Sequence, residues 1–161
     1  VVYGPLTYVN DSPIPGGKSA NMNLAYMVVP MNVSETSYTV SLWFKTPNST
    51  GGLIDVGNGG CDREVYLNNG QICGRVYGDE TICSTNQKLG DNKWHHLMHT
   101  YGGSTGGQEL WIDGKKIIKG FKANSDFTWQ NTIHIGGGGI CTSGYAGYID
   151  QVRIYETAFG K

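Results

Sequence analysis

Residues 109–115 read ELWIDGK, in which apolar and polar side chains alternate up to an Asp-Gly pair. A period of two is typical of a β-strand that buries one face. The Asp-Gly pair favours a two-residue hairpin turn, because both central positions of such a turn need positive φ. Similar alternation occurs at residues 92–97, NKWHHL, and at residues 147–155, GYIDQVRIY. These three segments predict strands of antiparallel sheets.

Short segments of this kind run along most of the chain, separated by turn signals. The clearest is residues 38–45, where alternate side chains from Tyr38 to Phe44 are apolar. No stretch shows a helical period over the roughly ten residues that a helix prediction needs. The sequence therefore predicts an all-β chain of about a dozen strands in two packed antiparallel sheets. The other predicted strands are residues 24–30, 52–57, 64–67, 71–77, 81–85, 94–101, 108–112, 115–119, 132–135 and 147–155.

Length and charge narrow the class of protein. The 161 residues suit one domain over residues 1–161, in which the Pro- and Gly-rich residues 1–20 form a leading segment. The net charge is −1 and 16% of residues are charged, so we expect no nucleic-acid partner. No apolar run approaches the roughly 20 residues of a membrane helix, so we expect no membrane insertion. The chain begins at Val1 and is interpreted as a mature product or a domain of a longer protein.

Four cysteines allow three disulfide pairings. Cys73 and Cys83 flank a turn signal at residues 78–79 almost symmetrically, which makes them cross-strand neighbours in a hairpin. Cys61 would then pair with Cys141 and join two glycine-rich loops. The chain has no Cys-x-x-Cys motif, so a zinc ribbon or thioredoxin-like site is not expected. Two disulfides indicate an oxidising compartment. We therefore expect the protein to be extracellular, either secreted or on a cell or virion surface.

Several of the strand motifs, taken in order, resemble the laminin-G-like, concanavalin A-like jelly roll. The resemblance covers about residues 20–159 and implies an antiparallel two-sheet jelly-roll sandwich. That family includes lectins, carbohydrate-binding modules, adhesins and matrix-protein receptors, so its fold alone does not decide the function. The motifs are YTVSLWF at 38–44, NKWHH at 92–96, LWIDGK at 110–115, IHIGG at 133–137 and IDQVRIY at 149–155.

The loops braced by the second predicted disulfide offer groups that suit a sugar. Sugars are bound by planar polar side chains and by an aromatic face under the ring. One loop carries amide, carboxylate and guanidinium groups, and the other carries Thr142 with further hydroxyl groups. The alternative is a solvated loop with no ligand, and for Tyr77 it is ordinary strand packing. The predicted ligand-binding residues are Asn58, Asp62, Arg63, Tyr77, Ser143 and Tyr145.

The resemblance also implies a calcium ion near the first and last strands, held by Asp150 and Asn23. Calcium takes several oxygen ligands, so neighbouring carbonyl groups would have to complete the site. The alternative is that Asp150 pairs with a Lys or Arg or caps a loop. Of the four histidines, His95 and His99 share a strand face but lie about 13 Å apart, which is too far to chelate one ion.

Catalysis is the least favoured function. Asp62 and Glu64 are the nearest approach to a catalytic carboxylate pair, at about 6.6 Å along a strand. We therefore expect a non-catalytic, lectin-like carbohydrate-binding domain of a larger extracellular or surface protein. The alternative is a protein–protein adhesion or receptor-binding domain, so the expected partner is a glycan or a cell-surface protein. The oligomeric state stays open. Trp94 and Trp111 are predicted to lie in the core.

Overall fold

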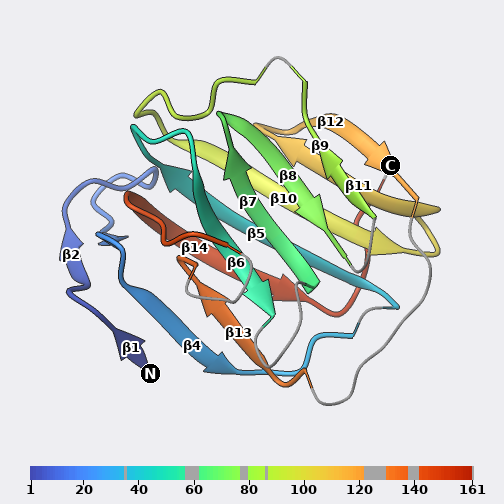
Figure 1. Cartoon of the computed structure of the whole chain (residues 1–161), viewed down its shortest axis with the longest axis horizontal. Coiled ribbons are helices and arrows are strands. Elements are labelled where there is room, and N and C mark those ends of the chain that lie inside the picture. The colour runs from blue at the N-terminus through green and yellow to red at the C-terminus, as the bar shows by residue number, and fades with distance from the viewer. Residues whose placement is uncertain are drawn as a thin grey trace.

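A computed structural model describes the chain at residues 1–34, 36–56, 62–76, 80–85, 87–121, 130–137 and 142–160. Every regular element within these ranges is a β-strand, as the sequence predicts. The same residues contain no helix long and apolar enough to span a bilayer. Fourteen strands form two sheets of seven that pack face to face (Figure 1). The antiparallel two-sheet sandwich predicted from the alternation is confirmed.

The first sheet, sheet A, has the order β1-β4-β13-β6-β7-β8-β9. All of its neighbouring strands are antiparallel. Its interior strands β6 and β7 are separated along the chain from β13, which pairs with β6 from the other side. Its strands are β1 (Val2–Tyr3), β4 (Tyr26–Pro30), β6 (Gly51–Val56), β7 (Asp62–Asn68), β8 (Gln71–Arg75), β9 (Thr81–Cys83) and β13 (Thr132–Ile135).

The second sheet, sheet B, has the order β12-β11-β10-β5-β14-β3-β2. The strand predicted most clearly, β5, lies at its centre between β10 and β14. The Asp113-Gly114 turn joins β11 to β12, with φ of 50° and 76° at its two residues. Its strands are β2 (Thr7–Val9), β3 (Ser19–Asn21), β5 (Tyr38–Lys45), β10 (His95–Gly102), β11 (Gly107–Ile112), β12 (Lys115–Gly120) and β14 (Tyr148–Tyr155).

The core lies between the inner faces of the sheets. In sheet B, Leu97 pairs with Leu42 on one side and with Ile112 on the other, and all three are buried. In sheet A, Val65 and Ile133 are buried in the same cluster. Burying a side chain of this size stabilises the fold by about 1.5–3 kcal/mol. The alternation seen in the sequence is therefore the alternation between core and outer face.

The two tryptophans predicted for the core lie elsewhere. Trp111 is half-buried on the outer face of sheet B, because its neighbours Leu110 and Ile112 take the inward positions. Trp94 is also half-buried, and its indole N–H donates to Asp11 Oδ1 at 2.9 Å. For both residues the core prediction was wrong: strand alternation turns Trp111 outward, and Trp94 precedes β10, where its indole N–H is bonded to Asp11.

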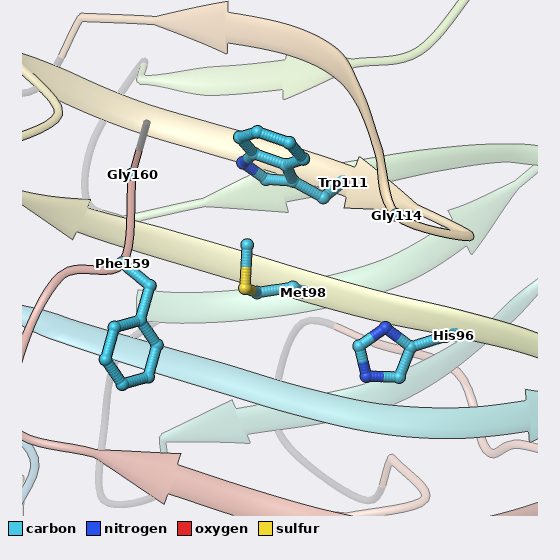
Figure 2. A pocket seen from close by; sticks show the side chains of 6 residues that line it. All are labelled: His96, Met98, Trp111, Gly114, Phe159 and Gly160. Atoms are coloured by element: carbon cyan, nitrogen blue, oxygen red, sulfur yellow. The ribbon is translucent and has the colours of Figure 1, made fainter.

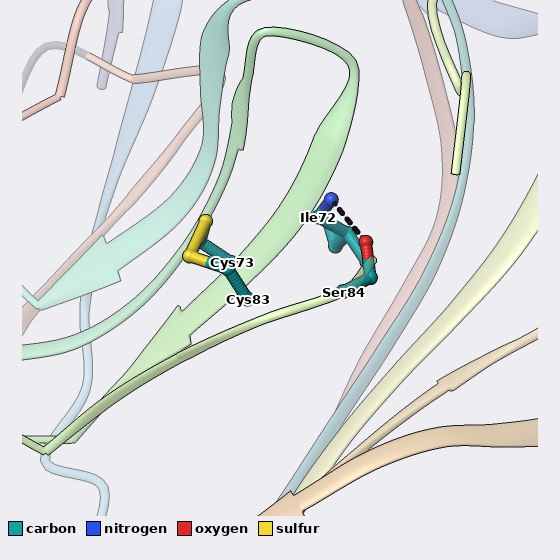
Figure 3. The surroundings of a disulfide bond; sticks show 4 residues. All are labelled: Ile72, Cys73, Cys83 and Ser84. Carbon is teal, nitrogen blue, oxygen red and sulfur yellow. Dashed lines mark hydrogen bonds between the residues drawn. A yellow bond between two sulfur atoms is a disulfide. The ribbon is translucent and has the colours of Figure 1, made fainter. Parts of the chain in front are cut away.

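The hairpin of β8 and β9 carries the disulfide predicted for it. Cys73 and Cys83 are directly opposite each other in the register and are bonded (Figure 3). Next to them, the Ile72 N–H donates to Ser84 Oγ at 3.0 Å, and the Ser84 N–H donates to the Ile72 carbonyl at 2.8 Å. The edge of sheet A is thus held by main-chain, side-chain and covalent links together. The predicted Cys61–Cys141 disulfide lies outside the described residues.

Candidate functional site

A polar pocket of about 270 Å³ lies where β6, β7 and the segment 142–144 meet. This size is slightly below the roughly 300 Å³ at which small-molecule sites begin. Its lining includes one aromatic residue, Tyr66, and two hydroxyl-bearing residues from the covering segment, Thr142 and Ser143. We call it the β6–β7 pocket. Its lining residues are Thr50, Gly51, Gly52, Tyr66, Leu67, Asn68, Thr142 and Ser143.

Glycines allow this pocket to form. At Gly52 a Cβ atom would lie 2.6 Å from Thr142 Cβ and 3.0 Å from Gly137 Cα, so only glycine lets the segment 142–144 approach β6 this closely. The Gly52 N–H also donates to the Ser143 carbonyl at 2.8 Å. The Gly51-Gly52 pair in the sequence is therefore the reason that Thr142 and Ser143 lie over the outer face of sheet A.

Tyr145 anchors the end of the same segment. Its side chain is fully buried, and its hydroxyl donates to the Lys45 carbonyl at 3.0 Å and to the Tyr148 carbonyl at 3.2 Å. Burial raises the pKa of Tyr145 far above its usual range, so the phenol stays neutral. The sequence analysis placed this phenol on a solvent-facing rim. That placement was wrong, because the ring fills the core and its hydroxyl satisfies two main-chain carbonyl groups.

Two buried carboxylates lie close to the pocket-lining residues Thr142 and Tyr66, on neighbouring strands of sheet A. Asp55 of β6 is 2% exposed and Glu64 of β7 is 3% exposed. The Thr142 hydroxyl donates to Asp55 Oδ2 at 3.0 Å, and His134 Nδ1 lies 3.1 Å from Asp55 Oδ1. Across the next strand, Glu64 is the register partner of Arg75. Asp55 is therefore hydrogen-bonded to one lining residue, Thr142, and Glu64 interacts electrostatically with another, Tyr66.

The protonation of Glu64 reflects this setting. Burial, with a smaller contribution from the negative charge of Asp55, raises the pKa of Glu64 to about 7 against the opposing effect of Arg75. Burial also raises the pKa of Tyr66, with Glu64 adding to the shift. The hydroxyl of Tyr66 makes no hydrogen bond to the residues that the structure describes. A neutral phenol that lacks such a partner lines the pocket and is able to bind a ligand.

Two of the residues predicted as ligand-binding from the first loop are buried. Asp62 is fully buried and Arg63 is 3% exposed. Arg63 has a φ of 47° and its guanidinium donates to Gln130 Oε1 at 2.7 Å. A direct rim role for these two side chains was therefore wrong, because the start of β7 turns them into the protein. Asn58 and Tyr77 lie outside the described residues.

The sequence analysis missed Asp55 and Tyr66, and it considered Glu64 only as a partner of Asp62. Asp55 stands in the run LIDV of a buried strand, where a lone acid signals a special environment. Tyr66 alternates with the core residues Val65 and Leu67, which places it on the outer face. Among the predicted residues, Ser143 does lie in the pocket, next to Thr142.

The two residues proposed for calcium are differently placed. Both carboxylate oxygens of Asp150 accept hydrogen bonds, from the Ser12 hydroxyl at 2.6 Å and the Gln151 N–H at 2.7 Å. Asn23 is exposed and lines a depression that Asp150 does not reach. Within the described ranges, no three His, Cys, Asp or Glu side chains are grouped to hold a metal ion. These donors do not fit a shared calcium site, and calcium binding by this chain stays a prediction.

The outer face of sheet B carries a second, apolar groove of about 290 Å³. The side chains of Trp111, Met98, His96 and Phe159 line it (Figure 2). Lys116 Nζ lies 5.4 Å from the centroid of the Trp111 ring. Burial lowers the pKa of His96, so this ring is neutral near pH 7. We call this surface, completed by Gly114 and Gly160, the Trp111 groove.

The sequence matches a known family over most of its length. The family, described as the concanavalin A-like lectin/glucanases superfamily, matches residues 17–161. A search of curated protein sequences found no match.

Solved structures with the same architecture include domains of an arabinanase, a laminin chain and a neurotoxin. Domain 4 of AbnA, an extracellular arabinanase from Geobacillus stearothermophilus, was solved in complex with arabinotriose. Its TM-score is 0.74 at 22% identity, over 98% of this chain and 78% of that one. Domains LG4-5 of the mouse laminin α1 chain give a TM-score of 0.63 at 18% identity, over 84% and 42%. The binding domain of botulinum neurotoxin DC in complex with SialylT gives 0.67 at 15%, over 99% and 43%. At these identities the likeness establishes the fold alone.

Proposed function

The chain belongs to the concanavalin A-like lectin/glucanases superfamily, and we propose that it is a non-catalytic carbohydrate-binding domain that holds its ligand in the β6–β7 pocket. The observation that carries the proposal is that Tyr66, Thr142 and Ser143 line one polar pocket together. A sugar ring presents hydroxyl groups at its edge and C–H groups on its face. A pocket lined by both an aromatic side chain and hydroxyl groups offers partners for both features.

The architecture of the pocket also supports binding in preference to hydrolysis. A glycosidase needs two carboxyl groups that reach the scissile bond. Asp55 and Glu64 are both at least 97% buried, and neither lines the pocket. Their contacts are made to Thr142, His134 and the opposing strands, so they hold other side chains in position.

Related structures are compatible with a role in carbohydrate recognition. The arabinanase domain was solved with arabinotriose and the neurotoxin domain with SialylT. Because this chain spans 43% of the neurotoxin chain and 42% of the laminin chain, the activity of any larger parent protein is a separate question. We propose an extracellular or surface location, which suits the Cys73–Cys83 disulfide.

The test is a glycan array followed by calorimetric titration of the best ligand, with arabinotriose included as a probe. We expect saturable binding to at least one class of glycan. It should be lost in the double variant Thr142→Val/Ser143→Ala and retained in Trp111→Ala, whose side chain lies on the other sheet. Repeating the titration in EDTA tests the calcium prediction. An array without signal, or binding that ignores the pocket variants, would refute the proposal.

A second candidate function, protein–protein adhesion, is favoured by the Trp111 groove. Trp, Met and Phe side chains are enriched at protein interfaces, and three of them line this groove. The partner would offer an apolar or aromatic anchor side chain. A blank glycan array together with Trp111-dependent binding to a purified surface protein would select this function.

A further inference from the structure

The hydroxyl of Thr142 presents a fixed polarity to the β6–β7 pocket. Its proton is donated to Asp55 Oδ2 at 3.0 Å. A hydroxyl has one proton and two lone pairs, so Thr142 Oγ1 offers only acceptor sites to anything inside the pocket. A ligand group at this position must therefore donate a hydrogen bond.

The carboxyl groups near Thr142 also disfavour a ligand group that can only accept hydrogen bonds. Asp55 is one hydrogen bond away from Thr142 of the pocket lining, and Glu64 on the neighbouring strand is close enough to Asp55 and Tyr66 to interact with them electrostatically. Among the described residues, two basic side chains face these acids, since His134 lies beside Asp55 and Arg75 opposes Glu64. Neither of these two side chains lines the pocket. At Thr142 Oγ1, a carboxylate, sulfate or phosphate on a ligand would meet acceptor lone pairs with the Asp55 carboxylate behind them, which costs binding free energy.

We infer that the β6–β7 pocket selects uncharged sugars, one hydroxyl of which donates to Thr142 Oγ1, and that Asp55 sets this choice as a positioning residue. The inference rests on the proposed function and narrows its ligand class. Sialylated, sulfated and uronic sugars are excluded from this pocket, whereas neutral pentoses and hexoses are accepted. Specificity of this kind uses a repulsive element as well as an attractive one.

The experiment compares glycans that differ only in charge. Lactose, 3′-sulfolactose and 3′-sialyllactose form one matched set, oligogalacturonide and its methyl ester form a second, and arabinotriose is a further neutral probe. We expect each anionic glycan to bind at least about tenfold more weakly than its neutral counterpart. Asp55→Asn gives Thr142 an amide donor as its neighbour, which frees the Thr142 proton to point into the pocket. The ratio of neutral to anionic affinity should then fall to about threefold or less.

Two controls separate this role from a structural one. Glu156→Gln removes one exposed negative charge far from the described contacts of the pocket, and should leave the ratio unchanged. Thr142→Ser keeps the acceptor and should retain binding, whereas Thr142→Val should weaken binding of the neutral glycan about tenfold. This pair carries the test if Asp55→Asn does not fold. Anionic glycans that bind as tightly as neutral ones, or a ratio unmoved by Asp55→Asn, would overturn the inference and leave glycan binding standing. Failure of every glycan would instead overturn the proposed function, and the inference with it.

Discussion

In both sheets, strand alternation turns every second side chain to the outer face, but the chemistry of the two outer faces differs. On sheet A, the outward positions of β6 and β7 hold Asp55, Glu64 and Tyr66, and a segment laid over glycine forms a polar pocket that Tyr66 lines and the two acids do not. On sheet B, the outward positions of β10 and β11 hold Met98 and Trp111, which remain as an open apolar groove. The core constrains only the inward positions of each strand. The outward positions are therefore free to vary in chemistry, and we propose a different role for each face.

The buried acid Glu64 makes the outer face of sheet A sensitive to pH. The pH dependence of the free energy of unfolding is the largest effect we expect. The pKa of Glu64 is about 7 in the folded protein, against 4.5 for the free side chain. The folded state therefore holds this proton more tightly, and the stabilisation is complete below about pH 4.5 and is lost as the pH rises through 7. The gap between the two values corresponds to about 3 kcal/mol.

Glu64→Gln removes that titration. Denaturant unfolding between pH 4.5 and 8 should show the wild type losing about 3 kcal/mol relative to the variant, so that Glu64→Gln is the more stable protein above pH 7. Glu156→Gln, with an exposed carboxylate, should follow the wild type at every pH. If the free energies of unfolding of wild type and Glu64→Gln changed in parallel with pH, the Glu64 carboxyl group would not be buried in solution.

The second effect concerns the segment that covers sheet A. Gly52→Ala places a Cβ 2.6 Å from Thr142 Cβ, so the segment 142–144 must move away from β6. Overpacking of this kind costs about 1–3 kcal/mol, and the pocket should lose its hydroxyl wall together with glycan binding. Calorimetry and thermal unfolding measure both losses. At Gly103 an added Cβ meets nothing within 4 Å, so Gly103→Ala should change neither. Equal behaviour of the two variants would contradict the role of Gly52.

The sequence predicts the strands because alternation reports directly on burial. The residues from Tyr38 to Phe44 were assigned to the correct face, and the Cys73–Cys83 bridge followed from the symmetry of its hairpin. The site was not predictable to the same degree. Alternation shows which side chains share a face within a strand, but not that β6 lies between β13 and β7, which is what brings Asp55 beside both His134 and Glu64.

Irregular backbone explains the remaining errors. A positive φ at Arg63 and two register shifts between β6 and β7 break the simple alternation that would have placed Asp62 on the rim. Tyr145 follows a segment without regular structure, so no period could indicate that its ring points into the core. Such features depend on contacts between distant segments, which a single sequence does not reveal.

The third effect tests the aromatic wall of the polar face. The Tyr66 hydroxyl makes no hydrogen bond to the described residues, so Tyr66→Phe should leave the free energy of unfolding unchanged within about 0.5 kcal/mol. If the hydroxyl contacts the sugar, affinity should fall about tenfold, because one hydrogen bond in the complex is lost. Calorimetric titration of the best array ligand measures this change. Unaltered affinity would show that the ligand does not contact the Tyr66 hydroxyl.

The smallest effect on glycan affinity should come from the apolar face. Trp111 is half-buried, its indole N–H donates to Glu109 Oε2 at 3.1 Å, and Lys116 lies over its ring. Trp111→Ala should therefore cost about 1 kcal/mol of stability through lost packing and cation–π contact. Glycan affinity should stay within twofold of the wild type, since changes at distant sites without shared partners do not couple. A large loss of glycan binding in Trp111→Ala would place the sugar on sheet B and contradict the proposal that glycans bind on sheet A.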